Sequence, residues 1–497
     1  MVLLSIVAWI LGMITPSIGY KYGVLIFLSV AYLAYVIYKV LIEKKDTEKW
    51  LKIIMLGGML MRMLFVLMAG YRAFEYHDAG AFAGPDAEYT ASGHFGYMEY
   101  IMKNWSMPPQ DPTKYWSFYN PPLYYIVSAI VLTVTGLFTT APLMYESVQI
   151  VSLCFAGLTV WNAYKLLKEL NIGRKPLVLI MAIVALHPWF SLAATITTPD
   201  TMVMFFSVVI LRYLIQWLRV PTTKNTVKIA VVLGLAALTK LSAVMLIPAI
   251  LFAFLYKKRV RQLLIGIAVC LPMLLFNPLR MMYQFHLQPF WTQTTGFAGD
   301  AELTPLQHLV VPAVNEFGYA LPQPLSNGAP GGNIWIQAIR TSLFNELRDD
   351  SSWDREFEIV GFMGFYTAVL LAVMANAGLV GIFVMKRKTV KTRALAVGTV
   401  GTLVTAYVTA LICFLNYNID QPFFCTTNYR YIGFTMLIPL ALSGVYLTRR
   451  PGGKFAKVFY IAGIVFVIAA ILVNIALLLE WMMRAGWAKP WWMFYNN

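Results

Sequence analysis

The sequence predicts an all-α polytopic membrane protein. Hydrophobic residues make up 59% of the 497 residues and charged residues only 12%, a composition outside the range of ordinary soluble domains. Apolar stretches long enough to cross a hydrocarbon core of about 30 Å recur along the chain, and such stretches cross as helices because the backbone must satisfy its own hydrogen bonds there. Basic residues stand in short clusters between these stretches. This is the positive-inside pattern, so the net charge of +16 sets orientation and does not indicate a nucleic-acid partner.

Placing each basic cluster in the cytoplasm orders the spans of the first half of the chain. The first apolar stretch lacks a basic leader and a small-residue cleavage site, so it is predicted to be a retained helix rather than a signal peptide. Residues 121–138 are apolar, but a crossing there would leave Lys165 and Lys168 outside. We therefore expect 121–138 to lie at the membrane interface with both ends outside. The predicted spans are 2–18, 22–42, 50–70, 145–165, 176–197 and 201–218.

The second half contains one broken stretch and five regular spans. Residues 228–256 carry basic residues at both ends and Lys240 in the middle, so two short helices that meet outside at Lys240 fit better than one crossing. The remaining predicted spans are 262–279, 359–384, 393–415, 431–447 and 455–480. By the length criterion this gives about thirteen spans in a single membrane domain, 1–497. Two large outer loops, 71–144 and 281–357, interrupt the series of spans. The spacing of the four cysteines does not suggest a zinc site or a disulfide framework.

The first outer loop is unusually rich in ionisable residues for this chain. It carries His77, Asp78, Asp86, Glu88 and His94. On the predicted topology, four more charged residues reach the same outer face, namely Asp200, Lys240, Arg280 and Arg430. A membrane protein that gathers carboxylates, histidines and cations at one surface is expected to use them on a substrate.

Each of these residues also has a simpler interpretation. Asp200 begins an inward span and is a candidate N-cap. Lys240 and Arg280 stand in apolar surroundings, where a charge is costly and usually functional, and Arg430 opens a predicted helix, where a cation gains nothing from the helix dipole. Snorkelling toward lipid headgroups is the alternative for the three cations. Asp111, like other scattered loop charges, is interpreted as solvated surface.

A carboxylate and several fixed cations at the outer membrane boundary define a reaction class. The carboxylate can take a proton from a hydroxyl as a general base. The cations can stabilise the charge that develops on a leaving phosphate. A phosphate held at the membrane by a lipid tail is a natural donor, whereas nucleotide sugars are disfavoured because they occupy the cytosol and no Gly-rich phosphate loop is present. The sequence therefore predicts group transfer from a lipid-linked phosphate by one displacement.

The order of the motifs resembles the GT-C membrane glycosyltransferases, and among them the bacterial relatives of protein O-mannosyltransferases and of the aminoarabinose transferase of lipid A. The resemblance covers about residues 50–490, with residues 1–49 as extra N-terminal helices. The matching pieces are His77-Asp78, Gly93-His94-x-x-Tyr97, Tyr119-Asn120-Pro121-Pro122, Thr-Pro-Asp200-Thr, Leu-Thr-Lys240-Leu-Ser-Ala, Asn277-Pro-Leu-Arg280, Trp335 to Glu346, and Asn428-Tyr-Arg430-Tyr431-Ile.

The resemblance implies inverting transfer of a sugar from a polyprenyl-phosphate donor. Asp78 best matches the general base and Asp86 is its rival. Asp200 matches a second acid that, in relatives, helps shape the site or bind a metal. The residues expected to bind substrate are His94, Tyr97, Asn120, Lys240, Arg280, Arg430 and Tyr431, with the three cations near the lipid phosphate. Many relatives have His where this chain has Asn120, and Asn cannot relay a proton at neutral pH. That departure strengthens the case for an aspartate as the base.

Several alternatives stay open at the level of sequence. A divalent metal is a possible cofactor, although the dense acidic cluster preferred by hard cations is missing. The main functional alternative is a transporter or flippase of lipid-linked glycans, which often has repeats and paired broken helices. An oligosaccharyltransferase is disfavoured, because it would normally carry a large soluble C-terminal domain and only a short aromatic tail follows the last predicted span. The acceptor is a glycan, a lipid or a protein, and a bacterial plasma membrane with the site facing outside is the expected location.

Overall fold

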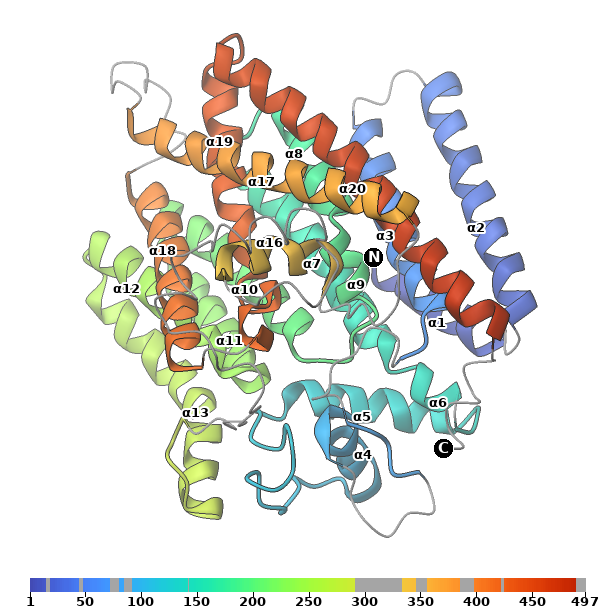
Figure 1. The fold of residues 1–497 in the computed structure, drawn as a ribbon. Helices are drawn as coiled ribbons and strands as arrows, with labels where there is room; N and C mark the ends of the chain where they lie inside the picture. Colours follow the sequence, from blue (N-terminus) through green and yellow to red (C-terminus); the bar gives the residue numbers. More distant parts are fainter. Residues whose placement is uncertain are drawn as a thin grey trace.

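The computed structural model is a helical bundle with a layer of short helices across one end (Figure 1). It describes residues 1–14, 18–43, 48–71, 80–84, 92–141, 143–290, 333–345, 355–384, 397–421 and 424–488. Every regular element in these ranges is a helix or a helical turn. Within them, eight helices are long and apolar enough to cross a membrane. The predicted all-α polytopic class is therefore confirmed.

The helices follow one another in the order shown in Figure 1. In the first half they are α1 (Val2–Ile14), α2 (Ile18–Ile37), α3 (Lys49–Met68), α4 (Gly93–Asn104), α5 (Leu123–Gly136), α6 (Leu143–Glu146), α7 (Gln149–Glu169), α8 (Arg174–Leu186), α9 (Pro188–Ala193) and α10 (Asp200–Arg219). In the second half they are α11 (Thr223–Thr239), α12 (Ile247–Tyr256), α13 (Val260–Phe285), α16 (Ile334–Phe344), α17 (Arg355–Val384), α18 (Val397–Asp420), α19 (Leu437–Arg449) and α20 (Lys454–Ala488).

The predicted number of thirteen spans is not confirmed, because several apolar stretches are interrupted. Predicted span 176–197 breaks at His187, where α8 ends and Pro188 opens α9, a position that suits proline because its missing N–H is not needed there. Predicted span 431–447 becomes helical only at Leu437, after short turns over Tyr429–Tyr431 and Gly433–Met436. The break predicted in 228–256 is present, since α11 ends at Thr239 and extended backbone at Lys240 leads into the turn Leu241–Leu246.

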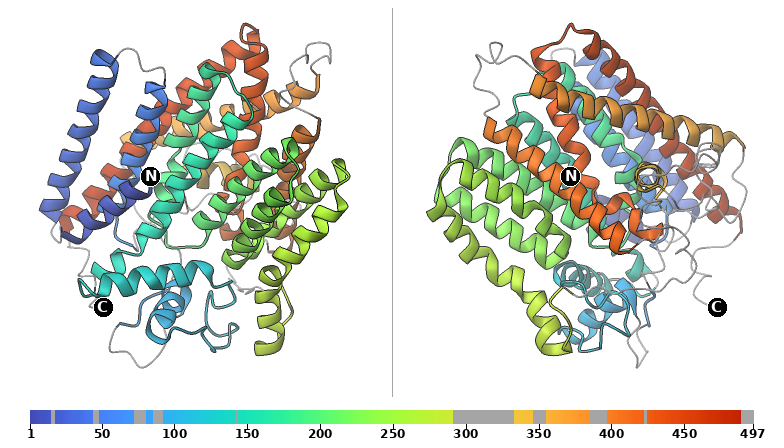
Figure 2. Two further views of the ribbon diagram at one scale, coloured as in Figure 1. Left: turned by 180° about the vertical axis from the view of Figure 1, so that it is seen from behind. Right: turned by 60° about the vertical axis from the view of Figure 1, so that its left-hand side comes forward.

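Helix α5 is the apolar stretch that was expected to lie at the interface. It is only 14 residues long, and it runs across the end of the bundle beside α4 and α6 rather than along the bundle (Figures 1 and 2). This arrangement fits the expectation, while the position of the bilayer itself stays a prediction.

A buried arginine holds α3 against the broken end of α8. Arg62 is 1% exposed, and its Nη1 donates a hydrogen bond of 2.9 Å to the carbonyl oxygen of Ala185 in the last turn of α8. A cation is favourable at this end of a helix. Gly58 makes the close approach of α3 possible, because a Cβ there would lie 2.4 Å from the same carbonyl oxygen. The interruption at Pro188 is thus tied to α3.

Candidate functional site

A cavity of about 280 Å³ brings together most of the predicted site residues. It lies where the start of α10, the Lys240 break, α4, α18 and the turn at Arg430 meet. His94, Asn120, Asp200, Lys240, Arg430 and Tyr431 all line it. These residues come from five separate stretches of the chain, so their convergence is a property of the fold.

Asp200 and Lys240 form a buried ion pair at the centre of this cavity. Lys240 Nζ donates to Asp200 Oδ1 over 2.5 Å, and the two side chains are 19% and 5% exposed. Asp200 is the first residue of α10, where a negative charge is favourable. Its side chain accepts its hydrogen bond from Lys240, and no side-chain cap is formed at the start of α10. The alternative interpretation of Asp200 as a simple N-cap is therefore wrong.

Arg430 adds a second cation to the cavity. It lies in the short turn Tyr429–Tyr431 rather than at the start of a helix, and its backbone N–H donates to Asn428 Oδ1 over 2.8 Å. The guanidinium donates to Tyr431 Oη over 3.0 Å, and Lys240 Nζ lies 4.8 Å from the centre of the Tyr431 ring. Among the described residues that line the cavity, two cations and one carboxylate leave an excess positive charge, which suits an anionic ligand.

Helix α16 supports this turn from behind. Thr341 Oγ1 accepts a hydrogen bond of 2.9 Å from the backbone N–H of Tyr429. Both Thr341 and Tyr429 are buried. The segment Trp335 to Glu346 was matched to an outer-loop segment of the resembled family, and its described part contacts the turn that carries Arg430.

The cavity wall at His94 is backed by an aromatic stack between α4 and α5. His94 Nδ1 and Tyr125 Oη are 2.7 Å apart, and the Tyr97 and Tyr125 rings stack with centroids separated by 4.0 Å. Tyr97 lies behind this wall and donates to the carbonyl oxygen of Asn120 over 3.3 Å. Burial raises the pKa of Tyr97 to about 12, against the opposing effect of Arg280. Tyr97 is thus a neutral hydroxyl at physiological pH.

Arg280 and Asn277 fasten the loop that contains Pro108, Phe118 and Tyr119 to α13. Arg280 donates hydrogen bonds of 3.2 Å to Phe118 O and 3.0 Å to Pro108 O, and another of 3.2 Å to Tyr97 Oη. Asn277 Nδ2 donates to Tyr119 O over 2.9 Å. Arg280 does not line the 280 Å³ cavity. Its contacts are those of a residue that positions the loop carrying Asn120.

Some residues in and around the site were not predicted from the sequence. Ser242 and Tyr417 line the cavity, and Tyr417 packs edge-on against Tyr431 at 5.4 Å. Glu99 is 2% exposed and accepts hydrogen bonds from the backbone N–H groups of Ala83 and Gly84 over 2.6 and 3.0 Å. A carboxylate between Met98 and Tyr100, five positions after His94, was a usable signal for Glu99. Tyr417 had no such signal, because it stands in an ordinary apolar span.

Two predicted aspartates lie outside the described residues. Asp78 and Asp86, with His77 and Glu88, fall in segments 72–79 and 85–91, so the choice of general base stays a prediction. In the part of the chain that the structure describes, no three His, Cys, Asp or Glu side chains gather as metal ligands would. The described carboxylate in the cavity, Asp200, is instead bound to Lys240.

Part of the chain matches the model of a known protein family. The model of the dolichyl-phosphate-mannose-protein mannosyltransferase family matches residues 120–281. A solved structure of the archaeal oligosaccharyltransferase AglB from Archaeoglobus fulgidus, in complex with an inhibitory peptide and a dolichol-phosphate, is 12% identical over 91% of this chain and 60% of that chain, with a TM-score of 0.49. This chain therefore spans about 60% of the length of AglB. No curated protein matches.

A second set of solved structures is of ArnT from Cupriavidus metallidurans. The apo form is 14% identical over 86% of this chain and 77% of that chain, with a TM-score of 0.38. The form bound to undecaprenyl phosphate is 13% identical over 82% and 79%, also with a TM-score of 0.38. The family match extends from Asn120 through Asp200 and Lys240 to just past Arg280. Over this stretch the predicted resemblance to relatives of the protein O-mannosyltransferases is confirmed.

Proposed function

We propose that this protein transfers a sugar from a polyprenyl-phosphate donor to an acceptor hydroxyl at the outer face of a membrane. The observation that carries the proposal is the buried cavity in which Lys240 and Arg430 surround Asp200. The match to the dolichyl-phosphate-mannose-protein mannosyltransferase family over residues 120–281 supports the same class of donor. The polyprenyl chain of such a donor holds it in the bilayer, from which it reaches the cavity.

Lys240 and Arg430 are the proposed ligands of the donor phosphate. Both are mostly buried, so their charges act at low dielectric, where electrostatic stabilisation is strongest. Arg430 offers a planar guanidinium and Lys240 a compact ammonium, which together suit several oxygens of one phosphate. Asp200 holds the Lys240 ammonium in place over 2.5 Å. We assign Asp200 this positioning role because its carboxylate is already engaged.

The proposed chemistry is one displacement at the anomeric carbon. The acceptor hydroxyl loses its proton to a carboxylate, and its oxygen forms the new glycosidic bond. The bond from the anomeric carbon to the phosphate oxygen breaks, and its electron pair leaves with the polyprenyl phosphate. Attack opposite to the leaving group inverts the configuration. Asp78 is the proposed base and Asp86 the alternative.

The proposal leaves the sugar open and assigns the acceptor to the class of hydroxyl-bearing glycans, lipids or proteins. We place the reaction at the outside of a bacterial plasma membrane because basic clusters occupy the opposite ends of the predicted spans.

The direct test is release of the lipid carrier. Purified protein in detergent is incubated with a panel of undecaprenyl-phosphate sugars and a cell-envelope extract, and mass spectrometry measures free undecaprenyl phosphate and new glycosides. Lys240→Met and Arg430→Met are expected to remove both products. Arg219→Met is the matched control, because Arg219 pairs with Glu169 at the far end of α10 and is 42% exposed.

The result that would contradict the proposal is equally direct. If no donor is consumed and the protein instead moves labelled lipid-linked sugar across vesicle membranes, the transporter alternative replaces the enzyme.

A further inference from the structure

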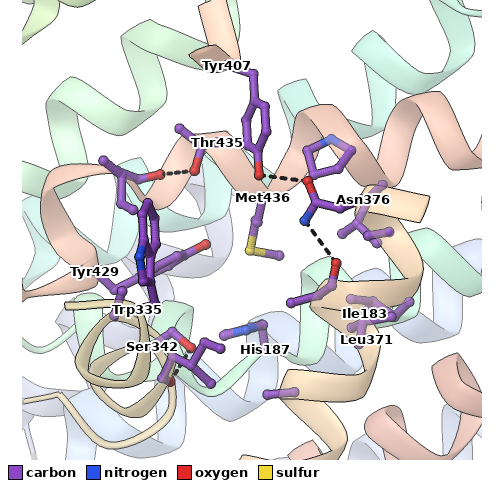
Figure 3. Close-up of a pocket in the computed structure, with 18 of the residues that line it drawn as sticks. Ile183, His187, Trp335, Ser342, Leu371, Asn376, Tyr407, Tyr429, Thr435 and Met436 are labelled. Carbon is purple, nitrogen blue, oxygen red and sulfur yellow. Dashed lines mark hydrogen bonds between the residues drawn. The ribbon is translucent and has the colours of Figure 1, made fainter. Parts of the chain in front are cut away.

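A second cavity, of about 220 Å³, lies inside the bundle apart from the ion pair. It is lined by residues of α16, α17, α18, α19 and α20 together with the end of α8, and several of these residues are labelled in Figure 3. Ile432 lines both cavities, while Arg430 and Tyr431 line the first and Tyr429 lines the second. The turn that carries Arg430 is therefore the partition between the two.

The walls of the second cavity are apolar, and its hydroxyl and amide groups are occupied. Tyr407 Oη donates to Asn376 Oδ1 over 2.9 Å, and Asn376 Nδ2 donates to the carbonyl oxygen of Ala372 over 2.9 Å (Figure 3). Tyr429 Oη, Thr435 Oγ1 and Ser342 Oγ donate to backbone carbonyl oxygens. A well-packed interior contains few voids of this size, and the walls repel ligands with many polar groups.

His187 is the exception in this wall. Its side chain is 6% exposed and lies among the lining residues, across the cavity from Met436 and the Tyr407–Asn376 pair (Figure 3). Nδ1 accepts the backbone N–H of Trp189 over 3.3 Å, so a neutral ring carries its proton on Nε2. Among the residues that the structure describes, Nε2 has no hydrogen-bond partner. The cavity thus offers the Nε2–H of His187 as a buried donor in largely apolar surroundings.

We propose that this cavity binds an acyl chain of a membrane lipid, with the ester carbonyl accepting the Nε2–H of His187. A polyprenyl chain fits the apolar walls but has no acceptor along its hydrocarbon, so it leaves the buried donor unsatisfied, which is unfavourable. An acyl ester supplies both an apolar chain and one carbonyl oxygen. Trp335, a lining residue that is 40% exposed, marks a side of the cavity that reaches the protein surface.

Neighbouring leucines on α17 provide matched variants. Leu371 lines the cavity and is 6% exposed, whereas Leu370 is 45% exposed on the outside of the same helix. Leu371→Trp fills the cavity, and Leu370→Trp makes the same chemical change without filling it. His187→Asn keeps a side-chain acceptor for Trp189 while removing the N–H at the Nε2 position.

The experiment is photolabelling of the purified full-length protein with a phosphatidylglycerol that carries a diazirine near one ester. Labelled peptides are expected in α17, α18 and α16 of the wild type and of Leu370→Trp, and are expected to be lost in Leu371→Trp. Losing one hydrogen bond in His187→Asn should lower labelling by about fivefold. Thermal denaturation shows whether each variant is folded. If Leu371→Trp is not folded, the smaller change Leu371→Phe is used in its place.

Competition separates the two sources of an apolar chain. Unlabelled phosphatidylglycerol should displace the probe, and undecaprenol should not. The proposal is overturned if Leu371→Trp is folded and labelled as strongly as Leu370→Trp, if the label falls on lipid-facing residues alone, or if undecaprenol competes as well as the phospholipid. This test uses no sugar donor, so its result is independent of the proposed glycosyltransfer.

Discussion

The buried pair between Asp200 and Lys240 predicts a specific pattern of stability. The two side chains are 5% and 19% exposed, and their charged atoms are 2.5 Å apart. Removing one partner of a buried pair leaves an uncompensated charge and typically costs 3–5 kcal/mol. Because Lys240 keeps some exposure, we expect the lower end, about 3 kcal/mol, for Lys240→Met.

The structure also ranks the two single variants. Lys240→Met leaves Asp200 with Arg430, which acts electrostatically on the same carboxylate. Asp200→Asn leaves Lys240 and Arg430 as like charges in one cavity, so it should cost more than Lys240→Met. The double variant Asp200→Asn with Lys240→Met leaves no unpaired partner, and should cost less than the sum of the singles by about 2 kcal/mol.

Thermal denaturation in detergent, followed by tryptophan fluorescence, measures these differences. The control is the exposed pair of Lys168 with Glu48, whose side chains are 51% and 50% exposed and 3.4 Å apart. Lys168→Met should change stability by under about 1 kcal/mol. If the double variant of the buried pair loses the full sum of the singles, Asp200 and Lys240 are not coupled and the assigned positioning role of Asp200 is wrong.

Three further predictions concern the base, the loop clamp and the core. Asp78→Asn should abolish the proposed transfer, measured by mass spectrometry of envelope glycans, whereas Asp86→Asn should retain part of it; the reverse result would make Asp86 the base. Arg280→Lys keeps the charge but not the planar set of donors that binds Phe118 O and Pro108 O. Limited proteolysis should therefore cleave near residues 108–120 faster than in wild type. An unchanged cleavage rate would mean that these hydrogen bonds do not hold the loop in place. Gly58→Ala places a Cβ 2.4 Å from Ala185 O and should lower the denaturation temperature, whereas Gly23→Ala, with nothing within 4 Å, should not.

The membrane class and the break at Lys240 were predicted from the sequence because their causes are local. Hydrophobic stretches indicate where helices form, and the basic clusters between them predict which ends lie in the cytoplasm. Lys240 in a stretch with short halves indicated its interruption, and α11 ends at Thr239. The interruption at His187 was missed, although Pro188 marks it in the sequence. The number of full spans depends on such breaks and was therefore less accessible.

Charge placement and motif order identified the candidate site residues. They did not identify the role of each residue. Asp200 and Lys240 are 40 positions apart and pair directly, whereas Arg280 contacts the Tyr97 hydroxyl 183 positions away. From sequence, Lys240 and Arg280 were equivalent buried cations. Only packing separates them, because α13 carries Arg280 to the carbonyl oxygens of the first loop and the break after α11 carries Lys240 to Asp200.

Sequence alone determined that this chain is a helical membrane protein with its charged residues reserved for a few positions. Hydrophobicity and charge act through solvent and bilayer, and each residue carries that information by itself. The tertiary structure decided which charged residues contact one another and which of them hold a loop in place. It also decided that a second, apolar cavity lies beyond the Arg430 turn. Those outcomes depend on contacts between helices far apart in the chain, and an apolar residue that lines a cavity is indistinguishable in sequence from one that faces lipid.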